Sequence, residues 1–147
     1  MLTVSVVIPV YRAEQTLLDL YRQLSDAMSE VTPDFEIIFV EDAGGDGSWP
    51  IIAELARTDQ RVRGFRMSRN YGQHNALLCG IRAAKHGIIL TMDDDLQHPV
   101  TEAKLLRSCG LGYNFIALRR AANATIETGY DTRIASSGQA AASPNAL

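Results

Sequence analysis

Excess positive charge, plentiful cysteine and long apolar runs are all missing from this sequence of 147 residues. The formal net charge is -3, which argues against a general nucleic-acid binder, because such proteins present a basic surface. Two cysteines, Cys79 and Cys109, make no disulfide framework and favour reduced thiols in a cytosolic compartment. No apolar run approaches the roughly 20 residues that span a bilayer. The N-terminus has no basic region ahead of its apolar run, so we expect neither a membrane span nor a signal peptide.

Short apolar runs alternate with helical patterns along the first part of the chain. The predicted strands are Val4–Val10, closing at Pro9, then Phe35–Val40, Val62–Met67 and Ile88–Met92. The predicted helices are Ala13–Met28, a helix that Ser48 caps with Pro50 near its first turn, and Asn75–Ala84. The alternation predicts an α/β fold with a mostly parallel sheet and flanking helices.

The composition supports one globular domain, since hydrophobic residues make up 46% of the chain and charged residues 21%. The pattern weakens after residue 102, where a helix through Leu105 and Leu106 and a weak strand over Asn114–Leu118 are expected. The last residues, 135–147, have low complexity. We therefore predict an α/β domain over residues 1–102 and an atypical, poorly ordered tail over residues 103–147.

The aspartates at the end of the fourth predicted strand are the clearest chemical signal. Asp93, Asp94 and Asp95 oppose each other's ionisation, and a divalent cation removes that cost. Mg²⁺ or Mn²⁺ takes hard oxygen ligands and usually keeps phosphate oxygens in its shell. If the segment stays extended, Asp93, Asp95 and Gln97 point together as metal ligands while Asp94 points elsewhere. The alternative is a solvated acidic loop, but the run follows an apolar strand and precedes Pro99, which favours a site.

Ligands of parallel sheets bind outside the carboxyl ends of the strands. The other features that lie there are Pro9–Tyr11 and the glycine-rich acidic loop from Glu41 to Ser48. The topology should bring both segments close to the aspartates, although they are far apart in the sequence.

Four segments occur together in a familiar order and spacing. They are Ser5–Tyr11, Ile37–Asp42, Ser68–Asn75 and Asp93–Pro99. Together they resemble the family 2 glycosyltransferases, and most of all the branch with dolichyl-phosphate mannose synthase and the bacterial undecaprenyl-phosphate sugar transferases. The resemblance covers about the first hundred residues and implies the nucleotide-diphospho-sugar transferase (GT-A) fold, incomplete at the C-terminus.

The resemblance also implies roles for single residues. Pro9 and Tyr11 match strand-end residues that pack on the nucleotide base, and Val40 and Asp42 match the second strand end, where the aspartate recognises the base. Three of these have structural alternatives, since Pro9 can simply end a strand, Tyr11 can belong to the core, and Val40 is core in either interpretation.

The aspartate segment matches the diphosphate and metal site of the family. Asp93 and Asp94 would bind the nucleotide, and Asp93, Asp95 and Gln97 would bind the metal. Asp95 is the strongest ligand candidate and the predicted catalytic residue.

Several further positions are less decided. Many relatives have an Asn-Glu pair after the tyrosine, where this chain has Arg12-Ala13-Glu14, so Glu14 is a nucleotide-contact candidate outside the usual pattern. Arg69 is either a phosphate contact or a surface arginine. His74 and His98 could face the site, although a lone histidine more often serves as a structural hydrogen-bonding group.

The implied reaction is metal-assisted transfer of a sugar, with inversion, from a UDP- or GDP-sugar to a polyprenyl phosphate. The expected location is cytoplasmic, at the inner face of the membrane, with no nucleic-acid partner. Family members continue well beyond this length, and the tail matches none of their acceptor half. We therefore expect a truncated or frameshifted chain that keeps the donor half.

Three rival interpretations follow from the same residues. The first is a nucleotide-sugar-binding module without turnover, which the missing acceptor half favours. The second is a dinucleotide-binding oxidoreductase, but no Gly-x-Gly-x-x-Gly turn follows the first strand. The third is a phosphoryl-transfer enzyme, which lacks a Gly-x-x-x-x-Gly-Lys loop.

Overall fold

The computed structural model describes residues 3–94 and 116–119 of the chain. These residues form one sheet with the strand order β3-β2-β1-β4-β5 and three flanking helices. The elements are β1 (Val4–Val10), α1 (Leu17–Val31), β2 (Phe35–Glu41), α2 (Ser48–Thr58), β3 (Val62–Arg66), α3 (Gln73–Ala83), β4 (Ile88–Thr91) and β5 (Ile116–Arg119). The first four strands pair in parallel, and β5 pairs antiparallel with β4.

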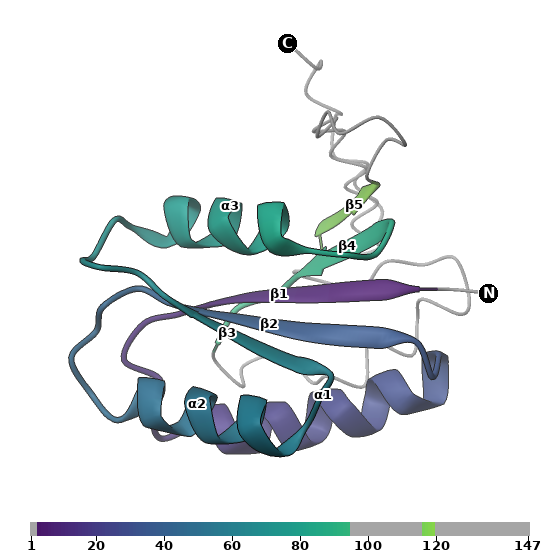
Figure 1. Ribbon diagram of the computed structural model, residues 1–147, viewed down its shortest axis with the longest axis horizontal. Coiled ribbons are helices and arrows are strands. Elements are labelled where there is room, and N and C mark those ends of the chain that lie inside the picture. Colours follow the sequence, from purple (N-terminus) through teal and green to yellow (C-terminus); the bar gives the residue numbers. More distant parts are fainter. Residues whose placement is uncertain (1–2, 95–115, 120–147) are drawn as a thin grey trace, which may run out of the picture.

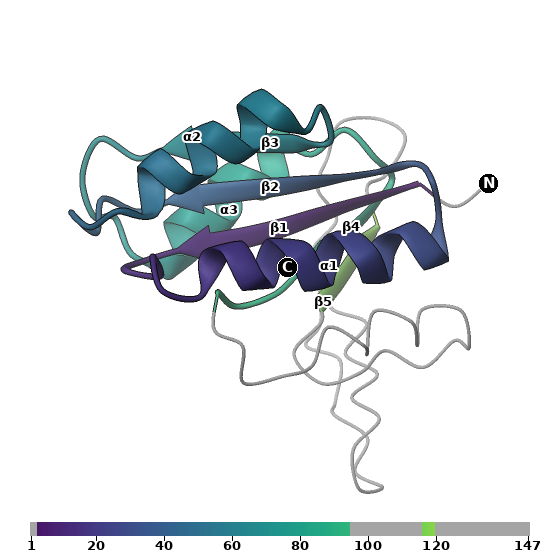
Figure 2. The same cartoon turned by 90° about the horizontal axis from the view of Figure 1, so that it is seen from below.

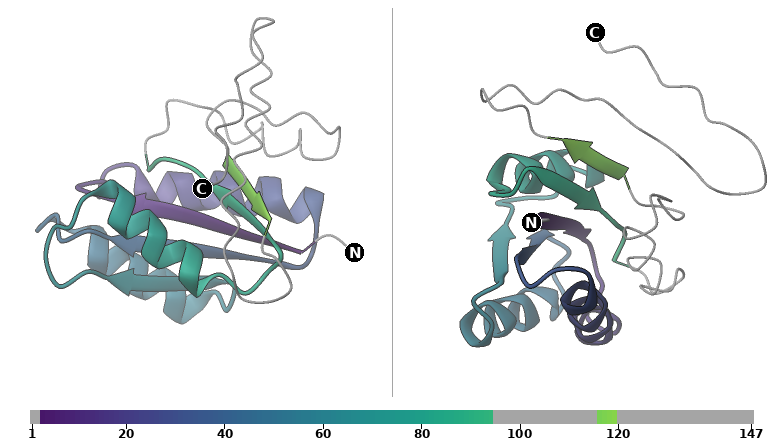
Figure 3. Two further views of the ribbon diagram at one scale, coloured as in Figure 1. Left: turned by 90° about the horizontal axis from the view of Figure 1, so that it is seen from above. Right: turned by 90° about the vertical axis from the view of Figure 1, so that its right-hand side faces the viewer.

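Helices cover both faces of the sheet. Helices α1 and α2 lie below it and α3 lies above it (Figures 1 and 2). The end-on view in Figure 3 shows the same layers, with β5 beside β4 at the edge. Every residue of β1 and β2 is buried, as expected for parallel strands covered on both faces. The predicted α/β fold with a mostly parallel sheet is confirmed.

Alternate side chains of the central strand β1 pack into two hydrophobic cores, one on each face of the sheet. Val6 and Ile8 of β1 pack with α1 and α2 below the sheet, whereas Val7 packs with Ile38 and with residues of α3 above it. The pleat of a strand sends successive side chains to opposite faces. The near-continuous apolar run that predicted this strand therefore reflects its burial on two sides.

Several predicted boundaries shift by a few residues. Helix α1 begins at Leu17 rather than Ala13, because a turn intervenes in which the Ala13 carbonyl accepts hydrogen bonds from the N–H groups of Thr16 and Leu17. Strand β4 ends at Thr91 rather than Met92, and Ile116–Arg119 confirms the weak strand. The predicted domain boundary at residue 102, the helix through Leu105 and Leu106, and residues 135–147 lie outside the described residues.

The predicted cap of α2 by Ser48 is wrong. Gly47 occupies the N-cap position and no side chain caps the helix there. Ser48 is the first helical residue, and its hydroxyl accepts a hydrogen bond from the Ala13 N–H at 3.0 Å. The Ser48 N–H instead donates to Asp46 at 3.1 Å, in the short-range turn that aspartate favours. The hydroxyl is thus used to join two loops rather than to start the helix.

Helix α3 approaches the sheet most closely at Gly80. A Cβ atom at this position would overlap a methyl carbon of Val7 and lie 3.0 Å from one of Val40. Only glycine leaves the space that this contact requires, because the interior is already close-packed. Gly80 therefore sets the height of α3 above β1 and β2.

A buried polar network ties the strands together at their amino ends. The Ser5 hydroxyl donates to Glu36 at 2.6 Å, and the backbone N–H of Lys85 donates to the same carboxylate oxygen at 2.7 Å. Arg63 donates to the other oxygen at 3.0 Å. Burial alone would raise the pKa of Glu36, but these three hydrogen bonds outweigh it and hold the pKa below its ordinary value. The network joins β1, β2 and β3 to the connection between α3 and β4.

Replacing Glu36 should therefore destabilise the fold. Glu36→Ala removes the shared acceptor of Ser5, Lys85 and Arg63, and we expect a loss of about 3 kcal/mol in the free energy of unfolding. Because the folded pKa is lowered, the ionised carboxylate stabilises the fold above about pH 4.3, the ordinary glutamate pKa. That stabilisation should disappear as the pH falls through the folded value.

Urea denaturation at pH 7 and at pH 3 measures both effects. The difference between Glu36→Ala and the unmodified chain should be large at pH 7 and smaller at pH 3. Glu54→Ala, which alters an exposed glutamate on α2, is the control and should leave the unfolding midpoint nearly unchanged. Equal midpoints for Glu36→Ala and the control at pH 7 would contradict the structural role of the network.

Candidate functional site

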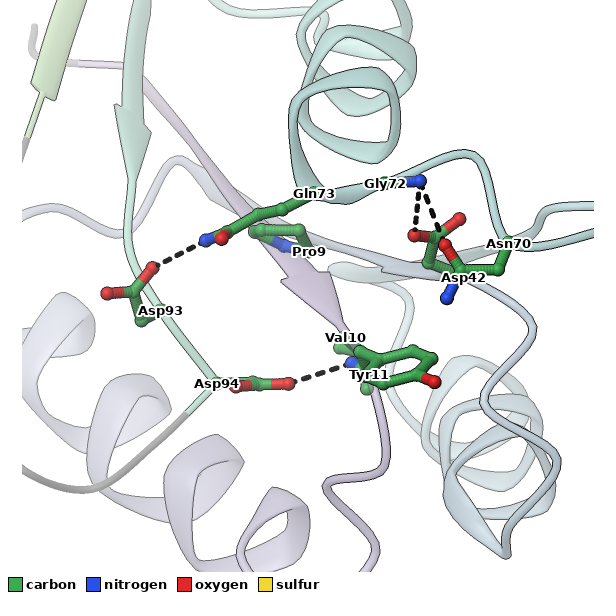
Figure 4. A pocket seen from close by; sticks show the side chains of 9 residues that line it. All are labelled: Pro9, Val10, Tyr11, Asp42, Asn70, Gly72, Gln73, Asp93 and Asp94. Atoms are coloured by element: carbon green, nitrogen blue, oxygen red, sulfur yellow. Dashed lines mark hydrogen bonds between the residues drawn. The ribbon is translucent and has the colours of Figure 1, made fainter.

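A pocket of about 420 Å³ opens at the carboxyl ends of β1, β2 and β4 (Figure 4), within the range usual for small-ligand sites. The segments after all four parallel strands and the start of α3 contribute to it. Its lining consists of Pro9, Val10, Tyr11, Asp42, Asn70, Gly72, Gln73, Asp93 and Asp94. The structure thus brings together Pro9, Tyr11, Asp42, Asp93 and Asp94 from among the predicted site residues. It does so at the sheet edge that the topology predicts.

One wall of the pocket is made by Tyr11 and Asp94. The Tyr11 N–H donates to a carboxylate oxygen of Asp94 at 2.8 Å, and the Thr16 hydroxyl donates to the Asp94 carbonyl at 3.0 Å. The Tyr11 side chain is 45% exposed, so it is not a core residue. Arg12 lies over its ring, with 5.1 Å between the guanidinium carbon and the ring centroid. An accessible aromatic ring with a neighbouring cation is suited to stacking against a flat, electron-rich group.

The opposite wall is organised by Asp42. Its carboxylate is buried and accepts hydrogen bonds from two successive backbone N–H groups, those of Tyr71 at 2.9 Å and Gly72 at 3.0 Å. Figure 4 draws the second of these bonds. Gly72 has a φ of 92°, a conformation that glycine adopts without the penalty of a side chain. Asp42 therefore holds the loop that leads into α3. In this structure, both of its oxygens are engaged by the protein.

Asp93 and Asp94 both line the pocket, and their carboxylates turn toward different partners (Figure 4). Both residues follow the end of β4 at Thr91. Asp93 is exposed and accepts a hydrogen bond from the side-chain amide of Gln73 at 3.0 Å. Asp95 and Gln97 lie outside the described residues. Within residues 3–94 and 116–119, no group of three or more side chains forms a ready-made metal cluster.

Glu14 lies in a brace between two loops and is not among the pocket-lining residues of the described part of the chain. Its carboxylate accepts a hydrogen bond from the Gly47 N–H at 2.8 Å, and its own N–H donates to Asp46 at 3.3 Å. These contacts, with the bond from Ala13 to Ser48, join the loop after β1 to the loop after β2. The arrangement supports a structural role for this carboxylate.

The remaining predicted residues lie around the pocket rather than in its lining. Val40 is buried in the core above the sheet, and in the β-ladder it pairs with Pro9. Arg69 stacks on Tyr71, with 4.6 Å from the guanidinium carbon to the ring centroid. His74 is exposed on the first turn of α3, and His98 lies outside the described residues.

Asn70 and Gln73 lie in the segment Ser68–Asn75 that carries the family resemblance, but no role was predicted for either side chain by itself. Both follow β3 and so leave the sheet at the same edge as the aspartates. The topological rule that located the other loops applies equally to this one. Their side chains gave no separate prediction, because a neutral amide is a weaker sequence signal than a run of carboxylates.

Comparison with known proteins decides the family. The model of glycosyl transferase family 2 matches residues 5–106. The chain belongs to this family. The predicted resemblance is therefore confirmed, and the matched segment contains the entire lining of the pocket.

Curated relatives of this family 2 chain include undecaprenyl-phosphate 4-deoxy-4-formamido-L-arabinose transferases. The protein from Aeromonas hydrophila is 35% identical over 119 residues, and the one from Pseudomonas aeruginosa is 38% identical over 120 residues. Each match covers 80% of this chain, but only 36% and 35% of the two relatives. The chain thus spans about a third of the length of these proteins.

Solved glycosyltransferase structures share the fold. S. aureus TarS in complex with UDP-GlcNAc matches with a TM-score of 0.53 and 19% identity, over 64% of this chain and 27% of TarS. The mannosyltransferase PcManGT from Pyrobaculum calidifontis, in complex with GDP-Man and Mn²⁺, matches with a TM-score of 0.53 and 22% identity, over 71% of this chain and 31% of that protein. The GT-A fold class is confirmed. Among the described residues, no helix is long and apolar enough to cross a membrane.

A mutation can distinguish a structural role of Glu14 from a contact with the nucleotide. Glu14→Ala removes the acceptor of the Gly47 N–H at the start of α2, and we expect a loss of about 1 kcal/mol in the free energy of unfolding. Nucleotide affinity, measured by calorimetry, should stay unchanged. Gln15→Ala, at the neighbouring exposed position, is the matched control. Unaltered stability together with much weaker nucleotide binding would instead make Glu14 a ligand contact.

Proposed function

We propose that the pocket binds the nucleotide-sugar donor of a glycosyltransferase that transfers the sugar to a polyprenyl phosphate. The observation that carries the proposal is the convergence of an accessible tyrosine and two aspartates in one pocket of a family 2 chain. An accessible aromatic ring suits the flat base of a nucleoside diphosphate, and carboxylates in the same pocket suit a cation bound to its anionic phosphates.

At the base end, Pro9 and Tyr11 would form the surface on which the nucleotide base packs. The exposure of the Tyr11 ring supports this role. Asp42 would shape the recognition of the base through the loop that it holds, and through its own carboxylate where a base displaces one of the backbone groups. Arg69 lies on the same loop and would approach the phosphates by leaving the ring of Tyr71.

At the diphosphate end, the described residues fit a divalent cation. Mg²⁺ and Mn²⁺ favour carboxylate oxygens, and Mg²⁺ is usually held by one or two carboxylates together with the substrate phosphates. Asp93 and Asp94 supply two such groups in the lining of the pocket. Asp95 and Gln97 are the further ligands predicted from the sequence, with Asp95 as the proposed catalytic residue. A bound cation would stabilise the charge that develops on the departing diphosphate.

The names of the curated relatives support the acceptor, since they are transferases that act on undecaprenyl phosphate. An oxygen of the acceptor phosphate would attack the anomeric carbon as the bond from that carbon to the nucleoside diphosphate breaks, which inverts the configuration. The acceptor is already an anion near neutral pH, so no strong general base is needed. Catalysis would rest on positioning and on electrostatic stabilisation. The reaction would take place at the cytoplasmic face of the membrane, where a lipid acceptor is accessible.

A second candidate function is donor binding without turnover. Both functions require the same pocket. Adding a polyprenyl phosphate distinguishes them, because only the transferase converts the donor.

Calorimetric titration of the purified 147-residue chain with UDP and GDP, with and without Mn²⁺, tests the donor site. We expect one of the two nucleotides to bind, and Mn²⁺ to strengthen its binding. Asp93→Asn should weaken the Mn²⁺-dependent binding at least about tenfold, because it removes a charged ligand candidate. Asp26→Asn, at an exposed position on α1, is the control and should bind like the unmodified chain. Failure of both nucleotides to bind under either condition would refute the proposal.

A further inference from the structure

Gln73 reaches across the pocket to Asp93. It is the first residue of α3, its side chain is exposed, and its amide nitrogen donates to a carboxylate oxygen of Asp93 at 3.0 Å (Figure 4). The two residues are 20 positions apart in the sequence. This hydrogen bond therefore connects the entrance of α3 with the end of β4, where the acidic segment starts.

The backbone that carries Gln73 is held firmly. Asp42 accepts hydrogen bonds from the N–H groups of Tyr71 and Gly72, and the side-chain amide of Asn75 donates to the Tyr71 carbonyl at 2.7 Å. The Gly72 carbonyl accepts the Ala76 N–H at 3.1 Å. The loop is thus fixed from β2 on one side and from α3 on the other, which gives the Gln73 side chain a well-defined origin.

The two aspartates of the pocket receive donors from different directions. Gln73 binds Asp93, whereas the Tyr11 N–H binds Asp94, and Figure 4 shows the two carboxylates turned toward these separate partners. Neighbouring carboxylates repel one another, and separate donors counteract this repulsion while keeping both groups in place. An amide is suited to this role because it orients a carboxylate and leaves its negative charge in place. A lysine at the same position would neutralise that charge.

We propose that Gln73 is a positioning residue that presets the Asp93 carboxylate for the cation and diphosphate of the donor. The inference rests on the proposed function. An exposed hydrogen bond between two side chains contributes little to the stability of the fold. The loss of the Gln73 amide should therefore lower the affinity for the nucleotide rather than the stability. The effect should be restricted to the part of the nucleotide affinity that depends on the metal, since the base end of the pocket does not involve this contact.

The test uses Gln73→Met, which keeps the length and helix propensity of the side chain but removes the amide donor. Arg82→Met, at an exposed position in the last turn of α3, is the matched control. The dissociation constant of the nucleotide is measured by calorimetry with saturating Mn²⁺ and without metal, and the melting temperature of each variant is recorded. We expect Gln73→Met to reduce the Mn²⁺-dependent gain in affinity about tenfold, as the loss of groups that orient metal ligands commonly does. Its metal-free affinity and melting temperature should match those of the control.

The other outcomes are distinct. A full Mn²⁺-dependent gain in Gln73→Met would overturn the positioning role while leaving the donor site intact. An equal loss of metal-free and metal-dependent binding, with a lower melting temperature, would show that Gln73 is only structural. Binding by the unmodified chain without any Mn²⁺ dependence would also overturn the inference. If the unmodified chain bound neither UDP nor GDP, the proposed function itself would fail.

Discussion

The parallel pairing of β1 with both β2 and β4 governs the arrangement of this molecule. The central strand is buried along its whole length and has helices on both sides, so no polar side chain that meets a ligand can be placed in its middle. Parallel strands also send their following loops to the same edge. Polar groups from distant parts of the chain, such as Tyr11, Asp42 and Asp93, therefore meet beyond the carboxyl ends of the strands. The pocket is a direct result of this pairing.

The acidic groups at this edge divide into two kinds according to their burial. Glu41 and Asp42 are almost completely buried, and each holds a loop: Glu41 accepts the Gly44 N–H at 2.7 Å and lies 3.5 Å from Arg66, while Asp42 binds the loop before α3. A buried charge needs such partners, because its desolvation is costly. Asp93 is exposed and Asp94 is half-buried, so they can meet a ligand. The buried pair fixes loops at this edge of the sheet, and the accessible pair is left open to a ligand.

The sequence was informative where physical patterns are local or topological. Apolar runs predicted the strands of the parallel sheet, and the strand-end rule predicted that Tyr11, Asp42 and Asp93 would meet. It failed where contacts depend on the path of a loop. The use of Ser48 to bind Ala13, 35 residues away, has no local signature. The same holds for Asp42, whose partners lie 29 and 30 residues further along the chain.

The close contact at Gly80 has a consequence for residues that it does not touch. Gly80 follows Gln73 by about two helical turns, or roughly 10 Å along the axis of α3. A helix transmits displacement along its length, because its hydrogen-bonded backbone bends little over so short a distance. Any added volume between Gly80 and Val7 would therefore tilt or lift the whole of α3, and the end that faces the pocket would move with it. The absence of a side chain at Gly80 thus determines how the ligand-facing end of α3 is aligned with the pocket.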